Sequence, residues 1–407
     1  MSRLTIIFLT IFIDLIGFGI VLPLLPFYAQ DFGATPLMIG LMVGVHPGMQ
    51  LIFAPIWGRM SDRVGRRPIL LIGLVGSGLS YLIFGLATSY WWLFASRVMA
   101  GIAGANVPVA QAYIADSTDA ANRTRGMGLV GAAFGLGFIA GPAIGGALSH
   151  FGYSVPGYFA AALSLSNAVA AYFYLPESLP QGARRRTAER AARGLLGRLR
   201  MALEFARRPA IGTLIGIFFT VTFVFAVFTT VFPLWLGVDL GYSARHAGYL
   251  MAFLGLVMAI VQGRLLGPLA ARLGERRLLV IGTSTLIGAY ALLPLSDGLL
   301  LLCGTLVLVA FGTGLNWPSL SSLASQYAEL DVQGAVLGVM QSLSSLGRML
   351  GAAWGGWVFG AWKPATPFFL SAAIMSLAAA LAALFMIKAP APPAERSERE
   401  PVASAPV

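Results

Sequence analysis

The sequence predicts an all-α integral membrane protein with twelve transmembrane helices in two six-helix repeats, with both chain ends on the cytoplasmic side. Three observations lead to this fold class: the composition, the number of apolar stretches and an internal repeat. Of the 407 residues, 57% are hydrophobic and only 11% are charged. A soluble domain cannot cover its surface with so few charges, so a lipid environment is expected.

Twelve apolar stretches are long enough to cross a bilayer, which takes about 20 residues. They run near 4–29, 37–57, 69–88, 91–115, 126–149, 155–175, 210–236, 246–268, 278–296, 299–325, 334–360 and 365–387. The first stretch is too long for a signal peptide and has an acid at its centre, so we expect it to stay as the first helix.

The two halves repeat each other at an offset near 210 residues. The matches are Pro23 with Pro233, Asn106 and Pro108 with Asn316 and Pro318, and Gly141, Gly145 and Gly146 with Gly351, Gly355 and Gly356. We therefore expect a first bundle over 1–175, a linker over 176–209, a second bundle over 210–388 and a disordered tail over 389–407. Such duplication is typical of alternating-access transporters with a substrate site between the halves.

The positive charges are gathered in the segments on one side of the predicted membrane. The net charge is +11, and the loops that would face the cytoplasm carry nearly all Lys and Arg. This bias predicts the orientation and accounts for the charge without nucleic acid. The basic linker over 176–209 is expected to lie on the anionic leaflet, with a dedicated lipid or partner site as the alternative.

The loop G-R-M-S-D-R-V-G-R-R at 58–67 is the strongest local signal. Its two glycines allow close backbone approach, and its acid stands among arginines in a dense charged cluster. Such a cluster can latch a cytoplasmic gate, although the arginines could also serve only to fix the topology. The predicted gating residues are Gly58, Asp62, Arg63, Gly65, Arg66 and Arg67.

Asp14 lies ten residues into the first predicted helix, about 15 Å from its cytoplasmic end and near the midplane. A carboxylate there is costly unless it is paired or neutralised, so it indicates a functional site. We expect Asp14 to carry the exchanged proton. A structural ion pair or a hydrogen bond within the helix bundle is the alternative.

Two further residues are candidates for proton coupling. Arg97, in the fourth predicted helix, is the natural partner for Asp14, with a plain buried ion pair that holds the two helices together as the structural alternative. His46, in the second, can titrate near neutral pH, or it can form a packing hydrogen bond.

Polar residues in both halves are candidates for a substrate cavity. Arg348 could attract an anionic group of the substrate or cap carbonyls of a neighbouring helix. The neutral candidates could line the cavity or join helices by hydrogen bonds. They are Gln50, Asn106, Gln111, Gln262, Asn316 and Gln341.

Three motifs resemble those of a known family. The loop at 58–67 resembles the signature of the major facilitator superfamily, and LFASRVMAGIAGA at 93–105 and GLGFIAGPAIGG at 135–146 resemble motifs of its twelve-helix drug:proton antiporters. The segments 49–71 and 131–146 are similar to tetracycline efflux proteins. The resemblance implies a role for Arg97 in proton transfer or gating. It also implies a seal between the halves at Gly137, Gly141, Pro142, Gly145 and Gly146.

The resemblance is incomplete at three positions. Ser80 and Thr285 stand where tetracycline efflux proteins carry Asp, and Met258 stands where they carry His. These differences leave a broader hydrophobic drug or an endogenous metabolite as alternatives to tetracycline as the substrate.

Taken with the resemblance, the sequence predicts a monomeric secondary exporter of the bacterial inner membrane rather than an enzyme. It would exchange a small, amphipathic molecule for protons. No nucleotide-binding glycine loop, metal constellation or catalytic triad is recognisable, so the proton gradient is expected as the energy source, with no cofactor. The alternatives are an exporter of a sugar or an anionic metabolite with Arg348 in the substrate site, and a non-transporting receptor or scaffold.

Overall fold

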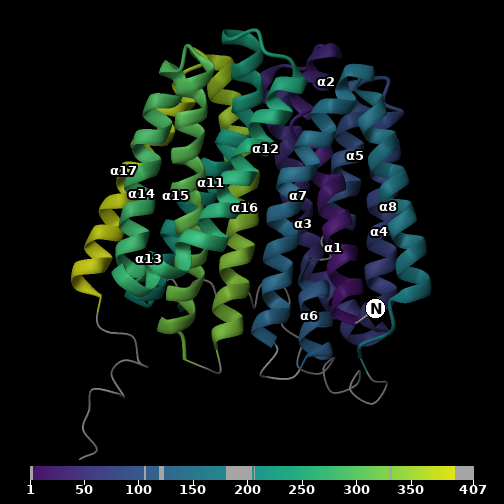
Figure 1. Ribbon diagram of the computed structural model, residues 1–407, viewed down its shortest axis with the longest axis horizontal. Coiled ribbons are helices and arrows are strands. Elements are labelled where there is room, and N and C mark those ends of the chain that lie inside the picture. The colour runs from purple at the N-terminus through teal and green to yellow at the C-terminus, as the bar shows by residue number, and fades with distance from the viewer. Residues whose placement is uncertain are drawn as a thin grey trace, which may run out of the picture.

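The computed structural model describes residues 3–104, 107–118, 123–179, 204–205, 207–329 and 332–389. Every regular element in these ranges is a helix, as predicted, and the helices form two bundles that lie side by side (Figure 1). Asn106, most of the predicted linker and nearly all of the predicted tail lie outside the described residues.

The first bundle contains eight α-helices. They are α1 (Arg3–Val21), α2 (Leu25–Asp31), α3 (Pro36–Val64), α4 (Arg66–Gly85), α5 (Tyr90–Ala103), α6 (Val107–Ser117), α7 (Arg123–Leu148) and α8 (Ser154–Tyr174), with a 3₁₀ turn η1 (Ser149–Phe151) after α7. The first predicted span is thus divided into α1 and α2. The break falls at Pro23, which lacks a backbone N–H to continue the helical ladder.

The second bundle follows the same order with fewer breaks. It contains α11 (Pro209–Asp239), α12 (Ala244–Ile260), the π-helical segment η2 (Val261–Leu265), α13 (Leu266–Leu273), α14 (Glu275–Leu292), the 3₁₀ turn η3 (Leu293–Leu295), α15 (Leu299–Tyr327), α16 (Gln333–Ala361) and α17 (Thr366–Lys388). Each of the twelve predicted stretches overlaps one helix or two or three consecutive ones. Ten of the described helical spans are long and apolar enough to cross a membrane. The count of twelve and the orientation stay predictions.

The two bundles touch at one end. We call the end that carries α2 the outer end, following the predicted orientation; it is at the top of Figure 1. There α3 packs on α16 so closely that a Cβ on Gly40 would lie 2.4 Å from the Ala352 carbonyl oxygen, and one on Gly356 would lie 2.3 Å from that of Pro36. Contact this close requires glycine.

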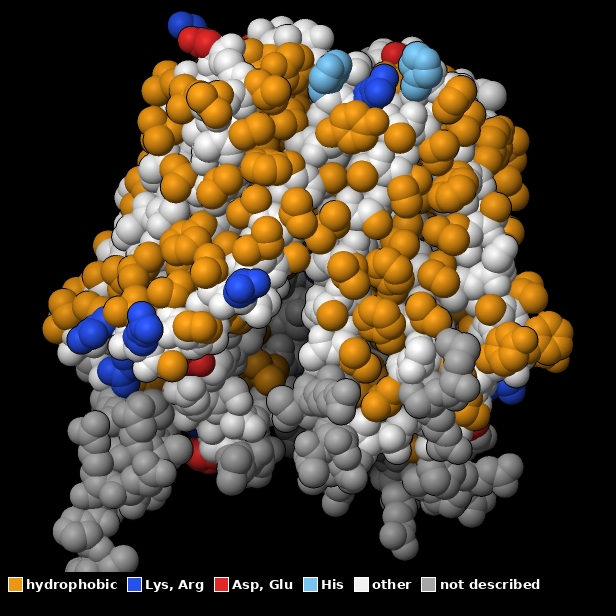
Figure 2. Space-filling view, in the orientation of Figure 1, with side chains coloured by type: hydrophobic (Ala, Val, Ile, Leu, Met, Phe, Trp, Pro, Cys, Tyr) orange, Lys and Arg blue, Asp and Glu red, His pale blue; other side chains and the backbone are white. Residues whose placement is uncertain are grey.

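A matching contact joins α7 to α12. A Cβ on Gly248 would lie 2.7 Å from the Gly146 Cα, and one on Gly255 would lie 2.7 Å from the Phe138 carbonyl oxygen. At the opposite, inner end the bundles separate, and Figure 2 shows a hollow between them. The molecule is therefore closed at the outer end and open at the inner end.

Backbone conformation repeats between the halves. Gly65, between α3 and α4, has φ +122°, and Gly274, between α13 and α14, has φ +78°. Gly33 and Gly241, which follow α2 and α11, have φ of +71° and +66°. Glycine adopts this region without the steric cost that a Cβ brings. The pair Gly33 and Gly241 extends the repeat beyond the matches read from the sequence.

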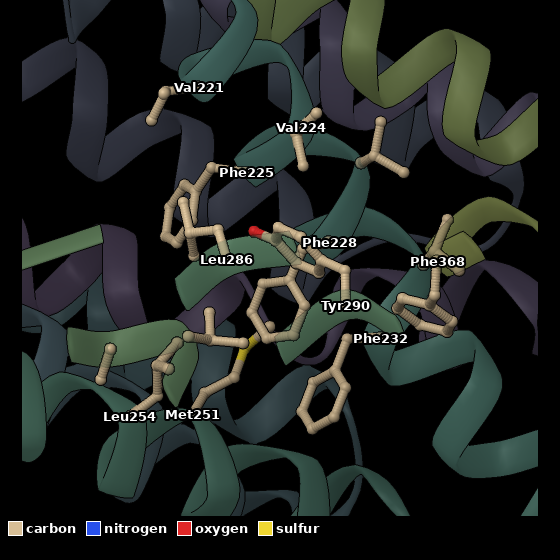
Figure 3. Close-up of a cluster of buried hydrophobic side chains, with 14 of the residues drawn as sticks. Val221, Val224, Phe225, Phe228, Phe232, Met251, Leu254, Leu286, Tyr290 and Phe368 are labelled. Atoms are coloured by element: carbon tan, nitrogen blue, oxygen red, sulfur yellow. The ribbon is translucent and has the colours of Figure 1, made fainter. Parts of the chain in front are cut away.

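The interior of the second bundle is aromatic and apolar. Figure 3 shows Phe228 and Phe232 of α11 beside Tyr290 of α14 and Phe368 of α17, and the two phenylalanine ring centroids are 4.9 Å apart. At the 210-residue offset, Val224 of α11 corresponds to Asp14 of α1. The second bundle therefore has no carboxylate at the position that corresponds to Asp14.

Candidate functional site

Asp14 lies at the centre of the first bundle among side chains of α4. Ser77 donates a hydrogen bond to its carboxyl group. The other carboxyl oxygen, Oδ1, is buried without a hydrogen-bond partner among the described residues. Tyr81 of α4 packs on α1 three residues further on, since a Cβ on Gly17 would lie 2.8 Å from the Tyr81 ring. The carboxyl is thus held by neutral groups.

Arg97 of α5 is buried in the same bundle, with 2% of its surface exposed. Its guanidinium carbon lies 5.7 Å from the Phe84 ring centroid and 6.0 Å from that of Tyr81, within the range of cation–π attraction. Nε donates to the Ser96 hydroxyl at 3.3 Å, and Nη2 is buried without a partner among the described residues.

Asp14 and Arg97 do not form the ion pair that the sequence suggested. Among the described residues, ion pairs join Arg66 to Asp62 and Asp116, and Arg208 to Glu329. Arg97 instead lies near the Tyr81 ring, which packs on α1 at Gly17, three residues from Asp14. The position of Arg97 along its helix could not reveal that aromatic rings, rather than the carboxylate of Asp14, lie beside its guanidinium group.

His46 of α3 packs on α5 and α1, while Gly44 and Gly48 on either side of it contact Met349 of α16. A Cβ on Gly101 of α5 would lie 2.5 Å from the His46 carbonyl oxygen, and the His46 ring centroid is 5.2 Å from that of Phe18. The imidazole Nε2 is also close to the end of α5, since a Cβ on Gly104 would lie 3.5 Å from it.

Arg348 lies on α16 next to Met349, whose carbonyl oxygen packs on Gly44 of α3. Gln341 precedes Arg348 by seven residues, two helical turns, so both share one face of the helix. Gln341 is exposed, whereas Arg348 is half-buried with its Nε enclosed. Nη2 donates to the Ser345 hydroxyl at 3.2 Å. Arg348 is thus half-buried beside the contact between α16 and α3.

Gln50 forms one of the predicted interhelical hydrogen bonds, whereas Asn316, buried without a hydrogen-bond partner among the described residues, fills neither predicted role. Gln50 donates to the Gly104 carbonyl at 3.3 Å, an interhelical hydrogen bond. Asn316 is fully buried against Gly282 of α14, so it does not line the hollow as the sequence allowed. Gln262 is half-buried in the π-helical segment η2, and Gln111 is exposed on α6.

The charged loop is organised around Arg66. Its Nη1 donates to Asp62 Oδ1 at 2.5 Å and to Ser61 Oγ at 2.6 Å, and its Nε donates to Asp116 Oδ2 at 3.1 Å. Glu177, after α8, accepts hydrogen bonds from the backbone N–H groups of Arg66 and Arg67 at the start of α4. A carboxylate at a helix N-terminus is favoured by the helix dipole.

All these partners belong to the first bundle except Glu177, which follows α8 at the start of the linker. Arg67 also donates to the Tyr172 carbonyl and stacks on the Tyr172 ring, while Arg63 is exposed and Gly58 faces open space. Asp116 and Glu177 were not recognised from the sequence, because each is far along the chain from the loop and carries no motif of its own. The gating role stays a prediction.

Arg66→Met should lower the free energy of unfolding by about 2 kcal/mol, since it removes three charge-assisted hydrogen bonds and leaves two carboxylates facing each other. Arg66→Lys should recover part of the loss, because it keeps the charge but not the planar fork. Thermal unfolding of the purified protein measures both. Arg63→Met, at an exposed position, is the control; an equal effect there would contradict the assignment.

The glycine motif of α7 faces two helices. Gly137, Gly141 and Gly145 pack on α1, where added Cβ atoms would lie 2.7, 2.6 and 2.2 Å from Leu15, Gly19 and Ile20. The Pro142 carbonyl and Gly146 face Gly248 of α12 in the other bundle. One helix thus combines packing inside its own bundle with contact between bundles.

Comparisons with known proteins identify what this arrangement resembles. A family model described as Major Facilitator Superfamily matches residues 7–352 and 264–407. The class B tetracycline resistance protein of Escherichia coli is 31% identical over 363 residues, which cover 85% of this chain and 89% of that protein. Multidrug resistance protein 2 of Bacillus subtilis is 32% identical over 352 residues, with 86% of each chain covered.

Solved structures agree on the fold. The human organic anion transporter MFSD10 (TETRAN) matches with a TM-score of 0.71 at 26% identity, covering 93% of this chain and 98% of that one. A bacterial homolog of the lysosomal transporter Spinster, in an inward-facing and occupied conformation, matches with a TM-score of 0.76 at 17% identity, covering 94% and 96%. This second likeness concerns the fold alone.

Proposed function

We propose a transport function from one premise: the chain belongs to the major facilitator superfamily. It is a multi-pass protein of the bacterial inner membrane and a transporter rather than an enzyme. The proposed activity is secondary active efflux of a small, amphipathic, drug-like molecule in exchange for protons. The buried carboxyl of Asp14, held by neutral groups in the middle of the membrane span, carries the proposal.

The proposed mechanism is alternating access. The two bundles rock about their contacts so that the hollow opens first to the inner and then to the outer end. Asp14 takes a proton when it faces outward and loses it when it faces inward. Arg97 is buried near the same tyrosine, so a small movement of α5 changes the field at the carboxyl and with it how readily the proton leaves.

The drug-like substrate is supported by the names of the relatives, which are tetracycline and multidrug resistance proteins. Tetracycline itself is less well supported. Ser80 stands where an acid is expected in tetracycline efflux proteins, and it is fully buried with its hydroxyl donating to the Ser77 carbonyl at 2.7 Å. We propose that the proton gradient is the energy source, that no cofactor is needed and that one chain is the working unit.

The test is a thermal-shift screen of candidate compounds, followed by transport of the hits. Purified protein in sealed vesicles is expected to move a stabilising compound against its concentration gradient when a pH gradient is imposed. A protonophore should abolish the movement. Transport that ignores the pH gradient would remove proton exchange from the proposal, and the absence of any transported hit would remove drug efflux.

A second candidate, efflux of an anionic metabolite, is favoured by one observation. Among the described residues Arg348 has no acidic partner, although it is half-buried beside the contact between α16 and α3. Membership of a transporter family leaves the receptor or scaffold alternative without support.

Arg348→Gln separates the two candidates. If the substrate is anionic, the variant should lose at least about tenfold in apparent affinity for a carboxylate compound, since a charge-assisted bidentate contact contributes about 1.5–3 kcal/mol. Arg348→Lys should keep part of that affinity. The matched amide of the same compound should be transported equally by all three proteins. An equal loss of apparent affinity for the acid and the amide would mean that Arg348 supports the protein structure and does not select the charge of the substrate.

A further inference from the structure

We propose that a groove on the membrane face of the first bundle, walled by α3, α4 and α5, holds one hydrocarbon chain of a phospholipid. The groove has a volume of about 470 Å³ and is lined by apolar side chains, glycine and alanine. We call it the α5 groove and mark its limits by Trp57, Ile72, Trp91 and Ile102.

The two faces of α5 are sharply different. Trp91, Ala95, Val98 and Ile102 recur three and four residues apart, so they form one stripe along the helix, and this stripe lines the groove. The opposite face carries Leu93, Ser96, Arg97 and Ala100, none more than 5% exposed. The helix that buries Arg97 in the bundle interior therefore presents its other side to lipid.

The length of the groove matches one leaflet. Trp91 is 69% exposed near the start of α5 at the outer end, where tryptophan favours the membrane interface. Ile102 follows eleven residues later, about 16 Å along the helix. Half of the hydrocarbon core of a bilayer is about 15 Å. A chain that enters beside Trp91 thus reaches the floor of the groove near the midplane.

The floor offers nothing to a polar ligand. Trp57 closes it, and its indole N–H already donates to the Ile102 carbonyl at 2.7 Å. At Gly76 the wall is as close as two helices can pack, since a Cβ there would lie 2.7 Å from the Ala103 Cβ. An apolar slot whose floor has its indole N–H satisfied fits a hydrocarbon chain, whereas the hydrogen-bonding groups of a polar ligand would lose their solvation there.

Occupancy adds packing to the helix that carries Arg97. A chain in the α5 groove contacts α3, α4 and α5 together, and each additional carbon contact contributes a small dispersion attraction. The groove therefore links the lipid to the position of α5.

Photolabelling of the full chain tests the proposal. The protein is placed in vesicles of phosphatidylcholine and phosphatidylglycerol that contain a phosphatidylcholine with a diazirine at the end of one acyl chain. Adducts on the peptides that carry Trp57 and Ile102 should exceed those on the lipid-facing peptide of α17 at least fivefold. Ala95→Phe fills the slot and should lower the adduct yield at Trp57 at least fivefold.

Ala373→Phe, at an exposed position on α17, is the matched control and should change nothing. Val98→Phe serves as a second groove variant if Ala95→Phe does not fold. Uniform labelling of all lipid-facing helices, or labelling unchanged by both groove variants, would overturn the proposal. So would loss of label on adding a transported compound, which would make the groove a substrate path, or cross-links to a second copy of the chain. These readouts are independent of transport, so the proposed function can fail separately.

Discussion

Vesicles that contain Asp14→Asn protein should show no transport driven by a pH gradient, while exchange of substrate at equal concentrations on both sides should continue. The asparagine keeps the shape of the side chain and can accept the hydrogen bond of Ser77. It cannot take up or release a proton. The halves should still rock with substrate bound, because no contact between the bundles is altered.

The measurement compares gradient-driven uptake with equilibrium exchange in one preparation. Asp31→Asn is the control, since Asp31 is an exposed carboxylate at the end of α2 and lies outside the bundle interior. It should leave both activities unchanged. Gradient-driven transport by Asp14→Asn protein would end the assignment of Asp14 as the proton carrier, and loss of both activities would point to a structural defect.

The helices could be predicted from the sequence, whereas the contacts between side chains of different helices could not. Hydrophobic length is a local property, so each predicted stretch overlaps helices in the structure. The π-helical segment at Val261–Leu265 and the break after α1 depend on local backbone geometry that hydropathy does not record. Asp116 and Glu177 reach the charged loop only through the packing of α6 and α8 around α4.

The candidate site shows the same division. Position along a helix placed Asp14 near the membrane centre and set His46, Arg97 and Arg348 within predicted helices, but it could not show which groups face each other. The contacts of Tyr81 with Arg97 and with α1 near Asp14 depend on how α4 packs. Asn316 appeared equivalent to Asn106 by repeat, yet it is enclosed against Gly282. A polar residue in an apolar helix thus indicates a function or a packing contact without deciding between them.

The repeat explains how the outer end closes. Gly356 of the second bundle packs on α3 of the first, and Gly146 of the first bundle packs on α12 of the second. The two glycines are 210 positions apart. Neither contact can exist once the outer end opens. Side-chain bulk at these positions should therefore act on one conformational state and leave the folding of each bundle intact.

Gly356→Ala should shift the protein toward conformations with an open outer end. The new Cβ would lie 2.3 Å from the Pro36 carbonyl oxygen, so the bundles must move apart there. Overpacking of this kind costs about 1–3 kcal/mol, a factor of about 5–150 in the population of the closed state. Efflux should fall, because the cycle can no longer return readily to the inward-open state.

Spin labels at Ser89 and Asp297, on outer loops of the two bundles, measure the opening in a Cys303→Ser background, since Cys303 is the single native cysteine. Distances between the labels should lengthen in Gly356→Ala and in Gly248→Ala, whose Cβ would lie 2.6 Å from the Pro142 carbonyl oxygen. Gly360→Ala is the matched control one turn along α16, where the nearest atom would be at an ordinary 3.5 Å. Unchanged distances in both seal variants would mean that the two glycine contacts do not hold the outer end closed.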